Sequence, residues 1–316
     1  MAPKKKTKTR GKKNTPKAVQ ETSPPMSISE KALQAAITAR FTADAQYEAA
    51  LERVRREQLS KGESKMATAA DKRTAAAVRE PLRILAEGDS WFRYACGVGV
   101  ITQLASKLSG KAIITNVASG GDTMQEMLTL PARAGLETRL RKGLEGRPWN
   151  AVLFSGGGND FCGKKFHTWL LPFTGQTDPA AAIDRTTWEP KLNEMAGLFK
   201  ELSALVATHV PGAPVHLNLY DFAIPNNKGA GPAGPWLAPG FKTRGYPANL
   251  AFRTAVVRLM LLEFAAMVAT VAGSHSNLRL VATQGTLMAN EWANELHPKN
   301  RGFGKIADLF AAAVRS

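Results

Sequence analysis

The chain has 316 residues, and its 44% hydrophobic content is enough to bury a sizeable core in one large domain or two smaller ones. Its formal net charge of +16 would suit a nucleic-acid-binding protein, but eight of these charges fall within the first twenty residues, which leaves +8 for the rest. That remainder does not by itself indicate a nucleic-acid groove. The only cysteines, Cys96 and Cys162, provide neither a disulfide framework nor zinc-ligand spacing. They favour a reducing compartment, so we expect a cytoplasmic protein.

The N-terminal quarter differs in composition from the rest of the chain. Residues 1–27 lack the apolar segment of a secretory signal and are predicted to form a disordered basic tail. Such a tail could contact nucleic acid or an anionic membrane weakly, serve as an import signal, or only improve solubility. Residues 28–80 are rich in Ala, Glu, Lys, Arg and Gln and predict a helical arm. A domain is expected over 81–316, in which charged residues interrupt the apolar run Leu250–Val271, so no transmembrane segment is predicted.

Short apolar runs alternate with helical patterns from Pro81 onward. The predicted strands are Leu82–Ala86, Ala112–Val117, Ala151–Phe154, Val215–Leu219 and Leu278–Ala282. The predicted helices are Val98–Leu108, Thr123–Leu130 with a second piece to Lys142, Lys191–Thr208, Leu250–Val271 and Gly302–Val314. This alternation predicts an α/β fold with a parallel sheet covered on both faces. Two long insertions, Phe161–Pro190 and Ile224–Pro247, interrupt it, and insertions of this length are often functional.

Three small or polar turns follow predicted strands closely, at Ser90, Gly121 and Asn159. In an open parallel sheet the carboxyl ends of the strands form the ligand-binding edge, so these turns are expected to converge. Ser90 is the candidate nucleophile. A serine hydroxyl needs a base within hydrogen-bond reach, and His297 is the best candidate. The other four histidines are interpreted as structural.

Acyl transfer also requires donors for the negative charge that develops on the carbonyl oxygen. The backbone N–H groups of Ser90 and Gly121 and the side-chain amide of Asn159 are the candidate oxyanion hole. A further group should orient the His297 imidazole. Both Asn294 and Glu295 lie just before it, and the residues alone leave the choice between them open.

These stretches together resemble the SGNH, or GDSL-type, hydrolase superfamily. The resemblance runs from Leu82 to Val314 and rests on four blocks: Gly88-Asp89-Ser90, Gly121-Asp122, Gly157-Gly158-Asn159-Asp160 and His297-Pro298. It implies a flavodoxin-like three-layer α/β/α sandwich with a five-stranded parallel sheet, and an ester hydrolysed by a serine mechanism without metal or cofactor. No Gly-x-Ser-x-Gly elbow is present, which argues against the larger α/β-hydrolase family.

The chain departs from the family pattern at one position. The resemblance implies an Asp three residues before the catalytic His, where this chain has Asn294. An amide cannot stabilise an imidazolium by charge as a carboxylate does. Three alternatives stay open: Glu295 orients the ring, Asn294 orients it as a neutral acceptor, or the site works as a Ser–His dyad.

The expected function is hydrolysis of an acyl or acetyl ester of a small molecule, lipid or sugar. The alternative is a nucleic-acid or polyanion-binding protein that uses its basic tail and carries a catalytically inactive SGNH-like domain. A metallophosphatase is a weaker alternative, because its paired Asp and His ligands are not visible at these turns. The sequence names neither the acyl group nor the alcohol, and it does not give the oligomeric state.

Overall fold

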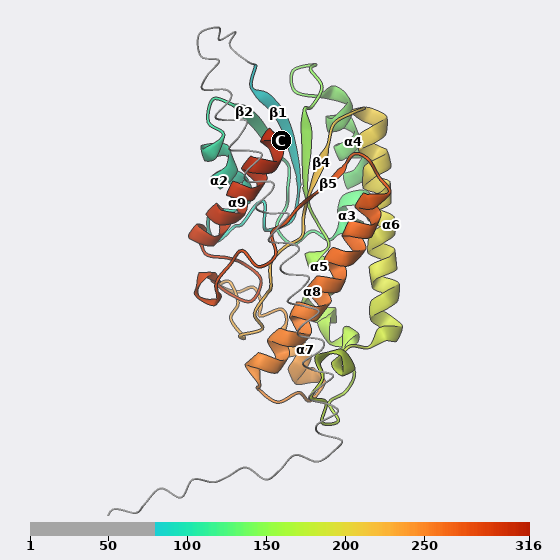
Figure 1. The fold of residues 1–316 in the computed structure, drawn as a ribbon, viewed down its shortest axis with the longest axis vertical. Coiled ribbons are helices and arrows are strands. Elements are labelled where there is room, and N and C mark those ends of the chain that lie inside the picture. Colours follow the sequence, from blue (N-terminus) through green and yellow to red (C-terminus); the bar gives the residue numbers. More distant parts are fainter. Residues whose placement is uncertain (1–79) are drawn as a thin grey trace, which may run out of the picture. The chain divides into compact units, whose positions relative to one another are not determined.

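The computed structural model describes residues 80–316 (Figure 1). The predicted basic tail, residues 28–79 of the predicted helical arm, and the polyanion contact assigned to the tail lie outside these described residues.

A single parallel sheet organises the described part of the chain. Its strands are β1 (Leu82–Gly88), β2 (Ala112–Asn116), β3 (Ala151–Ser155), β4 (Val215–Asn218) and β5 (Leu278–Val281), in the order β2-β1-β3-β4-β5. Every neighbouring pair is parallel, with Ile84 of β1, for example, opposite Ala151 of β3. This order is the flavodoxin-like one, and the predicted five-stranded α/β fold is confirmed. The strand order reverses between β1 and β3, so the crevice expected to bind ligand lies at their carboxyl ends.

Helices connect the strands and cover the sheet. They are α2 (Val100–Lys107), α3 (Met124–Leu128), α4 (Ala132–Lys142), α5 (Gly158–Phe161), α6 (Arg185–His209), α7 (Ala238–Thr243), α8 (Leu250–Gly273) and α9 (Asn300–Arg315). Short 3₁₀ segments occupy Gly163–Trp169, Pro179–Ala182 and Ala289–Glu291. The sequence did not predict α5, α7 or these 3₁₀ turns, since each is too short to show a helical period.

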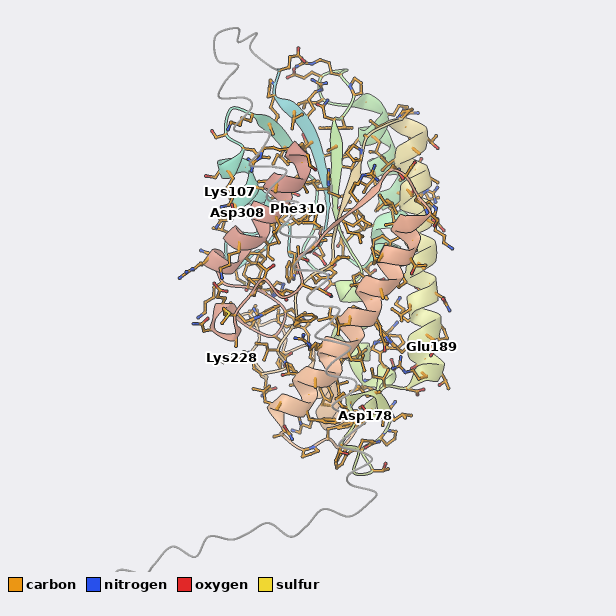
Figure 2. The ribbon with its side chains drawn as sticks, in the orientation of Figure 1. Lys107, Asp178, Glu189, Lys228, Asp308 and Phe310 are labelled. Atoms are coloured by element: carbon orange, nitrogen blue, oxygen red, sulfur yellow. The ribbon has the colours of Figure 1, made fainter. Side chains whose placement is uncertain are left out.

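The helices form two layers, with α2 and α9 together on one side of the sheet and α3, α4, α6 and α8 on the other (Figure 1). Lys107 of α2 forms an ion pair with Asp308 of α9 at 2.7 Å, and both side chains are labelled in Figure 2. Beneath this pair Phe310 packs edge-on against Phe92, with ring centroids 5.5 Å apart. The three layers explain why β3 and β4 are buried along their whole length.

Helix α6 begins six residues before its predicted start. The prediction placed the start directly after Pro190, but this proline lies inside the helix. Asp184 caps the helix by accepting a hydrogen bond from the Thr186 N–H. One turn later, the fully buried Trp188 donates its indole N–H to the Glu263 carboxylate of α8 at 2.8 Å. These tertiary contacts hold the first turns of the helix despite the backbone hydrogen bond that proline removes.

Helix α8 is the one described helix long and apolar enough to suit a membrane span, with a mean hydropathy of 2.0 over its most apolar window. In this structure 56% of that window is buried. Val256, Met260 and Phe264 belong to the core of the domain. The helix thus contributes to the core of the described domain.

Candidate active site

The nucleophile candidate stands at the turn that ends β1. Gly88 lies so close to β3 that an added Cβ would come within 2.6 Å of the Ser155 carbonyl oxygen, so only glycine fits there. The next residue, Asp89, donates its backbone N–H to the same carbonyl at 3.0 Å. The chain then turns, and Ser90 is left half-buried at the carboxyl edge of the sheet.

The buried Asp89 carboxylate stabilises this turn through hydrogen bonds. One oxygen accepts hydrogen bonds from the Trp91 N–H at 3.0 Å and the Ser155 hydroxyl at 2.9 Å. The other accepts the Tyr220 hydroxyl at 2.7 Å, and the same phenol oxygen accepts the Gly158 N–H at 3.0 Å. Burial raises the pKa of Asp89 to about 6, and these donors oppose that rise. One buried carboxyl group thus fixes the positions of the loops that follow β1, β3 and β4.

His297 lies against Ser90, although 207 residues separate them in the chain. The Ser90 Oγ and His297 Nε2 atoms are 2.7 Å apart. The loop that carries His297 is tied to the serine turn, since the Trp91 indole N–H donates to the Leu296 carbonyl at 3.0 Å. The two blocks therefore meet in hydrogen-bonding geometry, as serine activation by a base requires.

Asn294 occupies the other side of the imidazole. Its Oδ1 lies 3.0 Å from His297 Nδ1, and the same oxygen accepts the backbone N–H groups of Leu296 at 3.0 Å and His297 at 2.9 Å. Turning the amide over would point its NH₂ group at those two N–H donors, so the oxygen must face the ring. The Asn294 NH₂ group donates to the Tyr94 hydroxyl at 3.1 Å. His297 consequently carries its proton on Nδ1 and leaves the Nε2 lone pair for the Ser90 hydroxyl.

The ring is enclosed by aromatic side chains and has no charged partner. Tyr94 stacks on His297 with centroids 4.4 Å apart and planes 23° apart, and Trp236 meets its edge at 5.4 Å. Burial lowers the pKa of His297 to about 4, with no charged group contributing. The imidazole is therefore neutral at neutral pH.

Glu295 is placed away from the imidazole. The fully buried carboxylate accepts hydrogen bonds from four backbone N–H groups. They belong to Asn227 at 3.0 Å, Leu237 at 2.7 Å, Ala238 at 3.0 Å, and Trp236. These groups belong to the second long insertion and to the start of α7. The Glu295 carboxylate therefore binds backbone N–H groups and makes no hydrogen bond to the His297 ring, unlike the alternative in which it orients that ring. The side chain anchors the insertion.

The two remaining oxyanion candidates lie beside Ser90. The Asn159 NH₂ group, on α5 after β3, donates one hydrogen to the Asp122 carbonyl at 3.0 Å, which ties Asn159 to the loop of Gly121. Gly121 is exposed and has a φ of +98°. A Cβ on its neighbour Gly120 would lie 3.8 Å from the Ser90 Cβ, which places this loop against the serine. Ser90 and Asn159 therefore line one cavity, and Gly121 is the next residue after Gly120, which lies against the serine.

The thiol of Cys162 contributes to the orientation of Asn159. Its Sγ atom lies 3.7 Å from Asn159 Oδ1, so the amide oxygen faces the thiol and the NH₂ group faces the Asp122 carbonyl. Burial raises the pKa of Cys162 to about 12, so the group stays a neutral thiol. Cys96 is free and exposed.

Sequence reasoning missed several supporting residues, chiefly Tyr94, Trp91, Asn218 and Tyr220. Asn218 donates its side-chain amide to Ser155 at 3.0 Å, and Tyr220 adopts a positive φ of 60° to reach Asp89. A signal was available for this pair, because Asn218 ends β4 and Tyr220 comes two residues later, at the same carboxyl edge of the sheet as the turns after β1 and β3. Within residues 80–316 no group of three or more His, Cys, Asp or Glu side chains could hold a metal ion.

No family model matches the chain, and no curated protein matches it. The chain is similar in structure to Est24, a carbohydrate acetylesterase from Sinorhizobium meliloti, with a TM-score of 0.46 and 15% identity over 74% of this chain and 98% of that one. It is also similar to the lipase Lip_vut3 from a goat rumen metagenome, with a TM-score of 0.47 and 14% identity over 73% and 97%. A candidate SGNH hydrolase from Slackia heliotrinireducens gives a TM-score of 0.46 and 18% identity over 73% and 98%.

Proposed function

We propose that this protein is a serine ester hydrolase that uses Ser90 as nucleophile and His297 as general base. The observation that carries the proposal is the 2.7 Å contact between Ser90 Oγ and His297 Nε2, in a ring whose Nδ1 faces the fixed oxygen of Asn294. Nucleophilic catalysis needs a serine hydroxyl that is hydrogen-bonded to a basic nitrogen, with the base oriented by a third group.

The reaction has two halves. Ser90 Oγ bonds to the acyl carbon while its proton passes to His297 Nε2, and the ester C–O bond then breaks as Nε2 returns this proton to the leaving alkoxide. The alcohol departs and Ser90 carries the acyl group. A water molecule then attacks the acyl carbon and gives a proton to Nε2, the bond to Ser90 Oγ breaks, and the proton returns to Ser90 as the acid leaves.

The oxyanion that forms in each half needs donors fixed in place beforehand. The Ser90 and Gly121 N–H groups and the second amide hydrogen of Asn159 are the proposed donors. Asn159 suits this role because its Cys162 and Asp122 contacts hold the amide in one orientation. An amide that needs no reorientation stabilises the developing charge most effectively.

Asn294 is the proposed orienting residue, in place of the carboxylate of the related pattern. An asparagine at this position fails when its NH₂ group faces the ring, because the imidazole then adopts the wrong tautomer. Here the backbone N–H groups of Leu296 and His297 bind the amide oxygen and prevent that orientation. The site therefore keeps the productive tautomer and lacks only the charge.

A fluorophosphonate probe, which reacts with activated serines, tests the proposal on the full chain. Stoichiometric labelling is expected for the parent, together with hydrolysis of p-nitrophenyl acetate. Ser90→Ala should abolish labelling, and His297→Ala should lower both labelling and turnover by several orders of magnitude, because members of such a unit fail together. Ser119→Ala is a control on the neighbouring loop. Labelling that persists in Ser90→Ala, in protein with an unchanged circular dichroism spectrum, would contradict the proposal.

A further inference from the structure

A small apolar cavity opens beside Ser90, and its shape bears on the substrate of the proposed ester hydrolase. Ser90 and Asn159 are among the residues that line it. Its walls are mainly apolar side chains that are themselves buried: Trp91, Phe161, Leu237, Val257 and Leu261. Such a cavity accepts a hydrocarbon group and disfavours a charged or strongly hydrated one.

The position of His297 indicates which half of an ester enters this cavity. The leaving oxygen must take its proton from His297 Nε2, so the alcohol has to lie on the imidazole side of the reacting carbon. His297 is not part of the cavity wall, whereas Ser90 and Asn159 are. The carbonyl oxygen points to the proposed oxyanion donors, and the substituent left to enter the cavity is the acyl chain.

The cavity is short. The space open to the centres of water-sized groups is about 40 Å³. A cavity needs roughly 10–15 Å³ of such space for each water-sized group, so this one has room for about three carbon atoms beyond the carbonyl. Val257 and Leu261 of α8 line the cavity, and they are only 1% and 3% exposed. They belong to a close-packed core that cannot move apart without loss of contacts.

We infer that the protein acts on esters of short acyl groups, acetyl to butyryl, and that Val257 and Leu261 set this limit. The inference rests on the proposed function, because the cavity binds an acyl chain only if Ser90 is acylated. An acyl chain of eight carbons would have to displace buried side chains. Each methylene that does not fit is expected to reduce kcat/KM about tenfold or more.

The test is a series of p-nitrophenyl esters with two, four and eight acyl carbons, given to the full-length protein. For the parent we expect kcat/KM for the octanoate to be at least about 100-fold below that for the acetate. Leu261→Ala removes part of the cavity wall and should raise the octanoate-to-acetate ratio about tenfold or more. The matched control is Leu259→Ala, which removes the same atoms from a buried site on the same helix outside the cavity wall.

A second pair guards against poor folding of the leucine variants. Val257→Ala enlarges the cavity, while Val256→Ala removes an equally buried side chain that does not line it. A higher octanoate-to-acetate ratio in Val257→Ala but not in Val256→Ala supports the inference. A parent that labels with fluorophosphonate yet prefers the octanoate overturns it and leaves the proposed function standing. An unchanged ratio in both enlarged variants overturns the role of these two residues, and a parent that neither labels nor hydrolyses any ester overturns the proposed function and the inference with it.

Discussion

Replacing Asn294 by aspartate tests the orientation of His297 most directly, since this change adds only a charge to a geometry that is already correct. The oxygen facing the ring would keep its bonds from the Leu296 and His297 N–H groups. The second carboxylate oxygen would meet the Tyr94 hydroxyl, which can donate where it now accepts. The new carboxylate is therefore fully hydrogen-bonded, and we expect the variant to fold.

The size of the effect follows from the change in pKa. Burial alone now holds the pKa of His297 at about 4. A carboxylate in contact with an ionisable group typically shifts its pKa by about 1–3 units, and each unit is about 1.4 kcal/mol. An imidazolium forms in the transition state, so part of this free energy should lower the barrier. We expect Asn294→Asp to raise kcat about 10- to 100-fold.

The assay is the pH profile of kcat/KM for a short-chain ester, which reports ionisations in the free enzyme. In the parent the activity requires neutral His297 and should fall only as the pH drops toward about 4. In Asn294→Asp the raised pKa should move this acidic limb upward by at least about one pH unit. Unchanged or lower kcat, with the acidic limb still near pH 4, would refute the assignment of Asn294 to the ring.

Three further predictions concern the neighbouring groups. Glu295→Gln should lower the melting temperature and raise KM without moving the acidic limb, because an NH₂ group would oppose buried N–H donors at a cost of about 1–3 kcal/mol; differential scanning calorimetry and the pH profile check this. Asn159→Ala should reduce kcat by about 10²–10³ with little change in KM, measured by steady-state kinetics. Tyr94→Phe keeps the ring stacked on His297 but removes the acceptor for Asn294; we expect kcat to fall less than tenfold and the labelling of Ser90 to persist, as a labelling time course would show.

Much of the fold was predictable because burial on both faces of a sheet requires apolar strands, and β1 to β5 each begin at the predicted residue. The turns after β1 and β3 were predictable for the same reason, since parallel strands bring their carboxyl ends to one edge. The conformations of the two long insertions could not be predicted in this way. Their positions depend on contacts distant along the chain, such as the bonds from Asn227 and Ala238 to Glu295. No local pattern encodes such contacts.

The choice between Asn294 and Glu295 shows why adjacent residues in a turn cannot be assigned from spacing. In a strand, neighbours point to opposite faces, but in a turn each direction depends on the local backbone. Here Asn294 Oδ1 folds back on two N–H groups of its own turn, while Glu295 points into the insertion. The backbone conformation of this turn therefore determines the orientation of His297. The hydrogen bond from the Trp91 indole N–H to the Leu296 carbonyl helps to hold that conformation.

The buried carboxyl group of Asp89 connects the loops that carry the candidate site residues. Through Ser155 and Tyr220 it joins the ends of β1, β3 and β4, and Tyr220 passes the connection to the Gly158 N–H at the start of α5. The proposed nucleophile and the proposed oxyanion amide are thus positioned by one hydrogen-bond network, whose members are not themselves proposed to react. Since a buried polar network is stable only when all its members are satisfied, loss of one member should displace both Ser90 and Asn159. The separation of Ser90 from its proposed oxyanion donors is therefore set by residues at the end of a third strand. This explains why Asn218 and Tyr220 belong to the candidate site although neither is proposed to react.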